Sequence, residues 1–264
     1  MLQPHSFLWH YLWVGPHVLL VVLAVLAWRR GLHKFFPAFL FYLVYEALQG
    51  LTLYVLDRLP SVSGDNYWRA DIASLFIEGL VKLAVIRELF SHLVRPRPSV
   101  ARLGSRLIVC TGAVLVALAV EAAAHAPIAN YAILSHAHIL EEVIYITESG
   151  LLLFIFLFAA YHHLIWDRTG FGIALGLSIS ACVGLGVFAT CANGALFKGR
   201  YLLDFLDMGT YHACVLIWFY YLLPSVRPLA ASTESAASVK KANAPTHPAA
   251  RRLRPAWLLA LLQS

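Results

Sequence analysis

Long apolar runs recur along most of the chain, and they constrain the fold more than any other feature of the sequence. Of the 264 residues, 60% are hydrophobic and 13% are charged, whereas soluble domains carry about 25% charged residues. A helix of about 20 apolar residues crosses the roughly 30 Å hydrocarbon layer of a bilayer. A water-soluble fold could not bury so many runs of this length, so we expect a polytopic α-helical membrane protein.

Seven stretches are long and apolar enough to be predicted as transmembrane helices. They cover residues 8–28, 35–56, 70–94, 107–124, 139–165, 171–192 and 203–223. The first has no basic residue before it and is too long for a removable signal peptide, so we expect it to remain as a span. The third is the most polar, because Glu78, Lys82, Arg87 and Glu88 interrupt it. Residues 1–224 are therefore predicted to be one all-α domain, a seven-transmembrane-helix bundle.

Basic residues are distributed unevenly between the two sides of this predicted bundle. Fourteen of the 20 Lys and Arg residues follow the first, third, fifth or seventh span, and four lie on the other side. Because Lys and Arg stay preferentially on the cytoplasmic side, we expect an N-out, C-in orientation in a bacterial inner membrane. The segment 225–264 is rich in Ala, Ser, Pro and Lys and is predicted to be a basic, mostly disordered cytoplasmic tail. Its charges, with those of the basic loops, are available to membrane lipids and to a cytoplasmic partner, and no nucleic-acid-binding motif is present.

Small residues recur every four positions in the sixth predicted span, at Gly172, Gly176, Ser180 and Gly184. This spacing places them on one helix face and lets a neighbouring helix approach closely. We therefore predict that span 171–192 is tightly packed in the bundle.

Ionisable residues recur at one depth in four of the predicted spans. Counting from the span ends places Glu46, Lys82 and His212 at the middle of their helices, with Glu148 slightly outward of the middle of its own. A charge at bilayer depth costs about 2.5–3.5 kcal/mol on insertion scales. These side chains are therefore expected to face each other or a shared wet interior rather than lipid.

Further polar residues lie on the same helix faces, and Glu78 and Lys82 have the i, i+4 spacing of an ion pair. The predicted ligand- or ion-binding residues are Glu46, Gln49, Glu78, Lys82, Glu148, Asp207, Tyr211 and His212. With an acidic outer mouth above it, such a centre suits a small cationic or amphipathic ligand, or a proton. The alternative is that Glu46 or Glu78 simply neutralises Lys82 and hydrogen bonds satisfy the rest.

His136, His138, Glu141 and Glu142 form the pattern H-x-H-x-x-E-E where the span 139–165 begins. Imidazole and carboxylate groups bind zinc, but a catalytic site needs three converging ligands and an open position. Residues two apart cannot share a helix face, so His136 and His138 would have to lie in a loop. His138, Glu141 and Glu142 are kept as alternative metal ligands, while the leading prediction has no metal, no cofactor and no catalytic residue. Soluble-enzyme motifs such as a Walker loop, H-E-x-x-H and G-x-S-x-G are absent from the sequence.

Three parts of the chain resemble a family of uncharacterised bacterial seven-helix membrane proteins. They are WRRGLHKFFPAF, YWRADIASLFIEGLVKLAVIRELF, and LLDFLD with WFYYLL. The resemblance covers roughly residues 9–224 and implies the seven-helix architecture without a known activity. Size and layout are also similar to those of microbial rhodopsins. That family carries its chromophore lysine four residues after an aspartate of the last span, whereas Tyr211 stands four residues after Asp207 here, so retinal is not expected.

The leading hypothesis is a non-enzymatic inner-membrane protein that binds a small ligand or ion in an outward-facing polar pocket, for sensing or for regulating a partner. The first alternative is a proton-coupled or facilitative small-molecule transporter, although no internal repeat is visible in the sequence. The second alternative is an intramembrane metal-dependent hydrolase that uses the outer His/Glu cluster.

Overall fold

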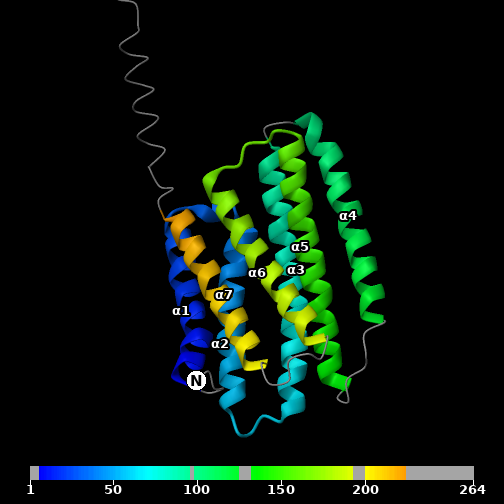
Figure 1. The fold of residues 1–264 in the computed structure, drawn as a ribbon. Helices are drawn as coiled ribbons and strands as arrows, with labels where there is room; N and C mark the ends of the chain where they lie inside the picture. The colour runs from blue at the N-terminus through cyan, green and yellow to red at the C-terminus, as the bar shows by residue number, and fades with distance from the viewer. Residues whose placement is uncertain (1–5, 96–97, 125–131, 193–199, 224–264) are drawn as a thin grey trace, which may run out of the picture. The chain divides into compact units, whose positions relative to one another are not determined.

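The computed structural model describes residues 6–95, 98–124, 132–192 and 200–223, and every regular element within them is helical. The elements are α1 (Phe7–Arg29), the 3₁₀ turn η1 (Leu32–Lys34), α2 (Pro37–Arg58), α3 (Gly64–Val94), α4 (Pro98–Ala124), α5 (Ala132–Tyr161), α6 (Arg168–Ala192) and α7 (Arg200–Leu222). Figure 1 shows that consecutive α-helices run in alternating directions. The predicted all-α class is confirmed, whereas the predicted tail 225–264 lies outside the described residues.

Five helical segments are long and apolar enough to cross a membrane. They are Phe7–Arg29, Pro37–Arg58, Leu140–Tyr161, Arg168–Thr190 and Leu202–Leu222. They correspond to the first, second, fifth, sixth and seventh predicted spans, and they indicate a multi-pass membrane protein. For α3 and α4 the assignment as spans stays a prediction.

Three helices, α3, α4 and α5, begin at least six residues earlier than predicted, because a search for apolar runs does not detect helical backbone that continues into polar sequence. α3 begins at Gly64 behind Ser63, whose hydroxyl accepts a hydrogen bond from the Asn66 backbone N–H at 3.3 Å. α4 begins at Pro98, so most of the connection between the predicted spans 70–94 and 107–124 is helical. Proline suits a first helical position, where its missing N–H would have no intrahelical partner. α5 begins at Ala132 and includes the positions of His136 and His138, which were predicted to lie in a loop.

α5 also ends before the predicted limit at residue 165, and His163 explains why. This residue has a left-handed backbone with φ of 50°. The Leu164 N–H donates to the Ala159 carbonyl and the His163 N–H to the Ala160 carbonyl, at 2.9 and 3.2 Å. This pair of hydrogen bonds is a Schellman motif, which satisfies the last carbonyls of a helix and stops it.

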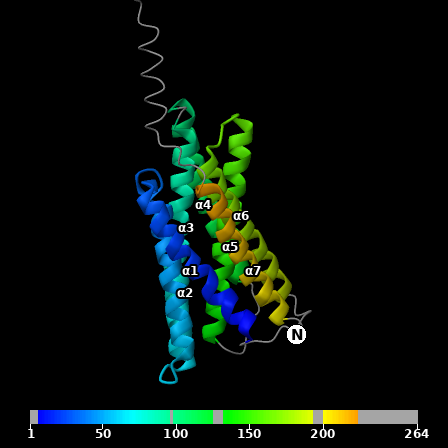
Figure 2. The ribbon, with the colours of Figure 1, turned by 90° about the vertical axis from the view of Figure 1, so that its left-hand side faces the viewer.

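Six of the helices pack in a closed ring in the order α1, α2, α3, α5, α6, α7 and back to α1. Among the described residues, α4 packs outside this ring, against α5 and α3. Figure 1 shows α4 at the edge of the bundle, and Figure 2 views the bundle from the opposite side, where α1 lies. The order in the ring differs from the order in the chain because α4 is left out, so α3 and α5 become direct neighbours.

The predicted close packing of α6 is confirmed by the surroundings of its glycines. A Cβ atom added at Gly172 would overlap Tyr221, and one added at Gly176 would overlap Trp218. Trp218 is completely buried, and its indole N–H donates to the Ile173 carbonyl at 3.4 Å. Gly172 and Gly176 therefore pack against aromatic rings of α7 and fix the rotation of α7 about its own axis, whereas Gly184 faces the Tyr145 ring of α5.

Glu88, one of the charges that interrupt the third predicted span, caps the neighbouring helix α2. Its two carboxylate oxygens accept hydrogen bonds from the backbone N–H groups of Ala38 and Phe39, each at 3.0 Å. These groups belong to the first turn of α2, where N–H groups have no intrahelical acceptor and the helix dipole favours a negative charge. Glu88 thus holds α2 against α3 at the end of the bundle remote from the α2–α3 loop.

Candidate functional site

Lys82 of α3 lies at the centre of a buried charged cluster. Its side chain is 6% exposed, and its Nζ atom lies 2.8 Å from Glu78 Oε1 and 3.1 Å from Glu148 Oε2. The Glu78 contact is the predicted i, i+4 pair on one helix. The Glu148 contact comes from α5, which reaches Lys82 because α3 and α5 are neighbours in the ring.

Glu78 links this ion pair to α2. The Gln49 side-chain amide donates from Nε2 to Glu78 Oε2 at 3.0 Å, so the two oxygens of Glu78 are held by Lys82 and by Gln49. The neighbouring Tyr45 hydroxyl donates to the Ser74 carbonyl at 2.7 Å. These contacts fix α2 against α3 at the level of the charged cluster.

Glu46 of α2 joins the cluster without pairing directly with Lys82. It is 7% exposed, and its Oε2 atom accepts a hydrogen bond from the Tyr211 hydroxyl of α7 at 3.2 Å. It also interacts electrostatically with Glu78, Lys82 and Glu148. The structure therefore brings together the predicted residues of α2, α3 and α5 with Tyr211 of α7.

The buried cluster carries more acid than base. Glu46, Glu78 and Glu148 face a single ammonium group, and Lys82 is the one basic residue among the buried positions that the structure describes. Full ionisation would leave excess negative charge in a poorly solvated interior, which is costly. The cluster therefore favours the uptake of positive charge, as a proton or as a cation.

Several buried polar atoms of the cluster have no hydrogen-bond partner among the described residues. They are Glu46 Oε1, Gln49 Oε1, Thr147 Oγ1 and Glu148 Oε1. Buried polar atoms are nearly always hydrogen-bonded, because an unmet hydrogen bond costs about 1–3 kcal/mol. These atoms are therefore available to a ligand that supplies hydrogen-bond donors.

His17 of α1 is a member of the polar interior that the sequence reasoning missed. Its Nδ1 atom donates to the Trp13 carbonyl at 2.5 Å, and its ring lies 5.7 Å from that of Tyr211. It interacts electrostatically with Glu78, and it fits because Gly50 of α2 leaves room for the imidazole. The depth count that selected Glu46 and Lys82 would also have selected His17, which stands near the middle of the span 8–28.

His212 and Asp207 lie apart from the Lys82 ion pairs. The ring of His212 lies 5.6 Å from that of Tyr11 on α1, and its Nδ1 atom has no hydrogen-bond partner among the described residues. Asp207 interacts electrostatically with Glu141 and Lys82. The predicted site residues of α7 therefore divide between the α1 interface and the α5 side of the bundle.

A row of polar groups on α5 extends from the cluster toward the N-terminal third of that helix. The Tyr145 hydroxyl donates to Glu141 Oε1 at 3.2 Å, and Lys82 Nζ lies 5.9 Å from the centre of the Tyr145 ring. Because Glu148 lies one turn beyond Tyr145, Glu141, Tyr145 and Glu148 mark one face of α5. The row leads from the cluster toward the end of the bundle where the acidic outer mouth is predicted.

The alternative metal ligands can be compared with the structure only in part. Among the described residues, no three His, Cys, Asp or Glu side chains are placed to hold a metal ion. The His138 side chain lies outside the described residues, whereas Glu141 and Glu142 are partly buried on α5. The helix α5 extends over the positions of all four residues of the pattern.

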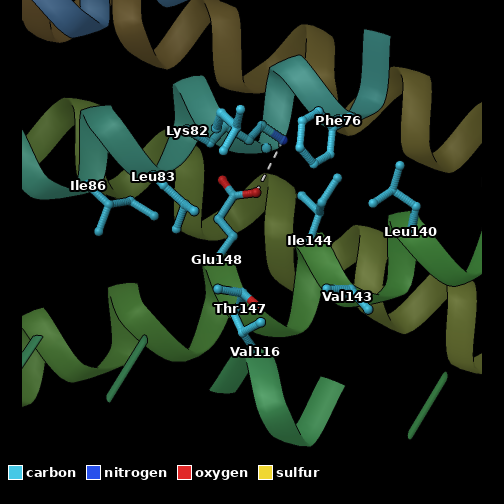
Figure 3. Close-up of a pocket in the computed structure, with 12 residues that line it drawn as sticks. Phe76, Lys82, Leu83, Ile86, Val116, Leu140, Val143, Ile144, Thr147 and Glu148 are labelled. Atoms are coloured by element: carbon cyan, nitrogen blue, oxygen red, sulfur yellow. Dashed lines mark ion pairs between the residues drawn. The ribbon is translucent and has the colours of Figure 1, made fainter. Parts of the chain in front are cut away.

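A cavity of about 130 Å³ lies next to the ion pair, between α3, α4 and α5. Most of its walls are apolar, and Lys82, Thr147 and Glu148 supply its polar groups. Figure 3 shows Lys82 and Glu148 pointing toward each other across the α3–α5 interface, with Val116 of α4 on the far side of Thr147. The charged cluster is therefore bordered by a cavity that does not lie on the bundle axis.

Comparison of the chain with family models, with curated proteins and with solved structures gives no match. The resemblance to uncharacterised seven-helix proteins stays a prediction, and the function has to be argued from the cluster itself.

Proposed function

We propose that the chain is a seven-span protein of the bacterial inner membrane that binds a small cation, or a proton, at the Glu46/Glu78/Lys82/Glu148 cluster. Binding there serves sensing or the regulation of a partner at the basic cytoplasmic face. The observation that carries the proposal is the excess of carboxyl groups over ammonium groups in the cluster, where the buried Glu46 and Glu148 and the partly buried Glu78 surround one lysine.

The insertion of α3 in the membrane is supported by the partners of its charged side chains. Glu78 and Lys82 pair with each other and with groups of α2 and α5, so neither faces lipid. The outer face of α3 is apolar, with Phe76, Ile77 and Leu80 about half exposed. A helix of 31 residues is about 46 Å long, which is more than enough to cross the hydrocarbon layer.

The N-out, C-in orientation is supported by arginines at the C-terminal end of α7. Arg30, just after α1, donates from Nη1 to the carbonyls of Leu222 and Leu223, and Arg168 at the start of α6 donates to the Tyr220 carbonyl. Basic groups are favoured at the negative end of a helix dipole. They gather at the end of the bundle that the positive-inside rule places in the cytoplasm.

A comparison of thermal unfolding in detergent, with and without cations, tests the proposal. The chloride salts of ammonium, methylammonium and sodium are added in turn at constant ionic strength. The wild-type protein is compared with the variant Glu46→Gln. We expect a cation that binds the cluster to raise the midpoint of unfolding saturably in the wild type, by mass action, and less in Glu46→Gln.

Asp57→Asn is the matched control, because Asp57 is an exposed carboxylate at the end of the same helix. It should retain the full stabilisation by cation. An equal response to every cation in Glu46→Gln and the wild type, or no response at all over pH 5–8, would show that the cluster is only structural.

A proton-coupled transporter is the second candidate function, and the row from Glu141 through Tyr145 to Lys82 and Glu148 favours it. Ionisable groups arranged in series within a bundle are typical of proton relays. Proteoliposomes with an internal pH dye distinguish the two functions. Proton flux that disappears in Glu46→Gln favours transport, whereas cation binding without flux favours sensing.

A further inference from the structure

The walls of the cavity beside the charged cluster are mostly apolar, unlike those of a water-filled mouth. Its apolar lining includes Phe76, Leu80 and Leu83 of α3 and Val143 and Ile144 of α5. Phe76 and Leu80 are 57% and 53% exposed, and on a membrane protein that exposed surface faces acyl chains. The cavity therefore borders the hydrocarbon phase at the place where α4 packs on α3 and α5.

Two buried polar atoms at the inner end of this cavity have no hydrogen-bond partner among the described residues. They are Thr147 Oγ1 and Glu148 Oε1, on side chains of residues that are 5% and 1% exposed, and both residues line the cavity. The second oxygen of Glu148 lies beside Lys82. The polar end thus offers a hydroxyl and a carboxylate oxygen, both able to accept a hydrogen bond.

The charge balance decides which polar group fits that end. Glu78 and Glu148 both flank Lys82, so the local charge is already negative when the groups are ionised. A carboxylate or phosphate head would be repelled by Glu148, and a head without a donor would leave Glu148 Oε1 unmet. A protonated primary amine supplies three donors and a positive charge.

We propose that this cavity, which we call the lateral crevice, binds an amphipathic primary amine. The ammonium group lies at Glu148 and Thr147, and the apolar chain lies along Phe76, Leu80 and Ile144. The ligand enters from the bilayer between α3 and α4. This inference rests on the proposed cation-binding function and adds the class of ligand and its route. A volume of about 130 Å³ is close to that of a cavity that holds benzene, so a chain of about six carbons fills it and a longer chain extends into the lipid.

The test measures protection of a cysteine in the crevice wall by n-octylamine. The native cysteines are replaced by alanine, Leu80→Cys is introduced, and its alkylation by a maleimide is timed in detergent. At a concentration ten times that of half-saturation, alkylation should be about tenfold slower, because the bound fraction is shielded. Octanoate and 1-octanol are the comparison probes, and neither should match the amine.

Two further variants separate binding in the crevice from general effects of an amphiphile on the micelle. Leu48→Cys lies on an exposed face of α2 that does not line the cavity, and its alkylation should not change. Val116→Trp fills the α4 side of the cavity and should remove the protection of Leu80→Cys. Val109→Trp, on the same helix but not in the cavity lining and 68% exposed, should leave that protection intact.

The outcomes separate this inference from the proposed function. If methylammonium stabilises the protein through Glu46 but octylamine does not protect Leu80→Cys, the cation site stands and the lateral crevice is wrong. Stronger protection by octanoate than by octylamine would overturn the assignment of an amine. If methylammonium does not stabilise the protein and octylamine does not protect Leu80→Cys, both the cation site and the lateral crevice are wrong.

Discussion

Glu148 of α5 and Lys82 of α3 form an ion pair with 3.1 Å between Oε2 and Nζ, although 66 positions separate them in the sequence. The pair forms because α4 packs outside the ring, which makes α3 and α5 neighbours. Glu78 holds the same ammonium group from one turn away. Lys82 is thus the positive centre around which Glu46, Glu78 and Glu148 of three helices gather.

Replacement of Lys82 should therefore cost more than replacement of any one acid. Lys82→Met leaves Glu46, Glu78 and Glu148 without a counter-charge, and we expect a loss of about 3–5 kcal/mol in the free energy of unfolding. Glu148→Gln keeps Lys82 paired with Glu78 and relieves excess negative charge, so its loss should be smaller than that of Lys82→Met. Unfolding by SDS in mixed micelles measures both, and Leu83→Met, at a partly exposed neighbouring position, is the control. Equal losses for the two variants would mean that Lys82 is not the centre of the cluster.

The close contact between α6 and α7 predicts opposite results for two glycines of the same helix. Gly176→Ala places a methyl group on Trp218, which is completely buried and cannot move aside, so we expect a loss of about 1–3 kcal/mol. Gly186→Ala meets no atom within 4 Å and should be neutral or slightly stabilising. Thermal unfolding of the two variants in one detergent provides the comparison. A neutral Gly176→Ala would contradict the packing of Trp218 against α6.

The cap on α2 predicts a local effect of Glu88. Glu88→Ala removes the acceptor of the Ala38 and Phe39 N–H groups and should cost about 1 kcal/mol, as the loss of a helix N-cap does. Hydrogen exchange followed by mass spectrometry should show faster exchange in the first turn of α2, with α6 unchanged. Arg87→Ala, at an exposed position next to Glu88, serves as the control. If the exchange of the Ala38 and Phe39 amides is unchanged in Glu88→Ala, Glu88 does not cap α2.

The loop between α3 and α4 decides whether these two helices cross the membrane. In a cysteine-free background, Ser63→Cys before α3 should react with an impermeant maleimide in intact cells. Arg95→Cys after α3 should react only after permeabilisation, because α3 carries it to the cytoplasmic side. If Arg95→Cys reacts in intact cells while Ser63→Cys also does, α3 and α4 do not span and the bundle has five transmembrane helices.

The depth of the polar residues could be predicted from the sequence, because depth along a helix follows from a count at 1.5 Å per residue. That count found Glu46, Lys82 and Glu148, and the i, i+4 rule found the contact between Glu78 and Lys82. The rotation of each helix and the order of helices in the ring could not be predicted in this way. They depend on contacts between distant segments, such as Trp218 and Tyr221 against the glycines of α6.

The same limit explains the two histidines. His212 was grouped with the midplane acids by depth alone, yet its ring lies against Tyr11. His17 was overlooked, although its helix places it in the polar interior beside Tyr211. The His17 imidazole packs against Gly50 of α2, and this contact between two helices cannot be predicted from the sequence of α1 alone.

Calorimetric titration of methylammonium chloride into the purified protein, in wild-type and Glu46→Gln forms, measures cation uptake by the buried cluster most directly. Glu46 is the suitable residue to change, because its Oε1 atom has no hydrogen-bond partner among the described residues and it is not one of the two acids paired with Lys82. We predict saturable binding to one site in the wild type, and binding at least about tenfold weaker, or about 1.4 kcal/mol, in Glu46→Gln. Identical isotherms for the two proteins, or no saturable heat in either, would contradict a cation site at this cluster.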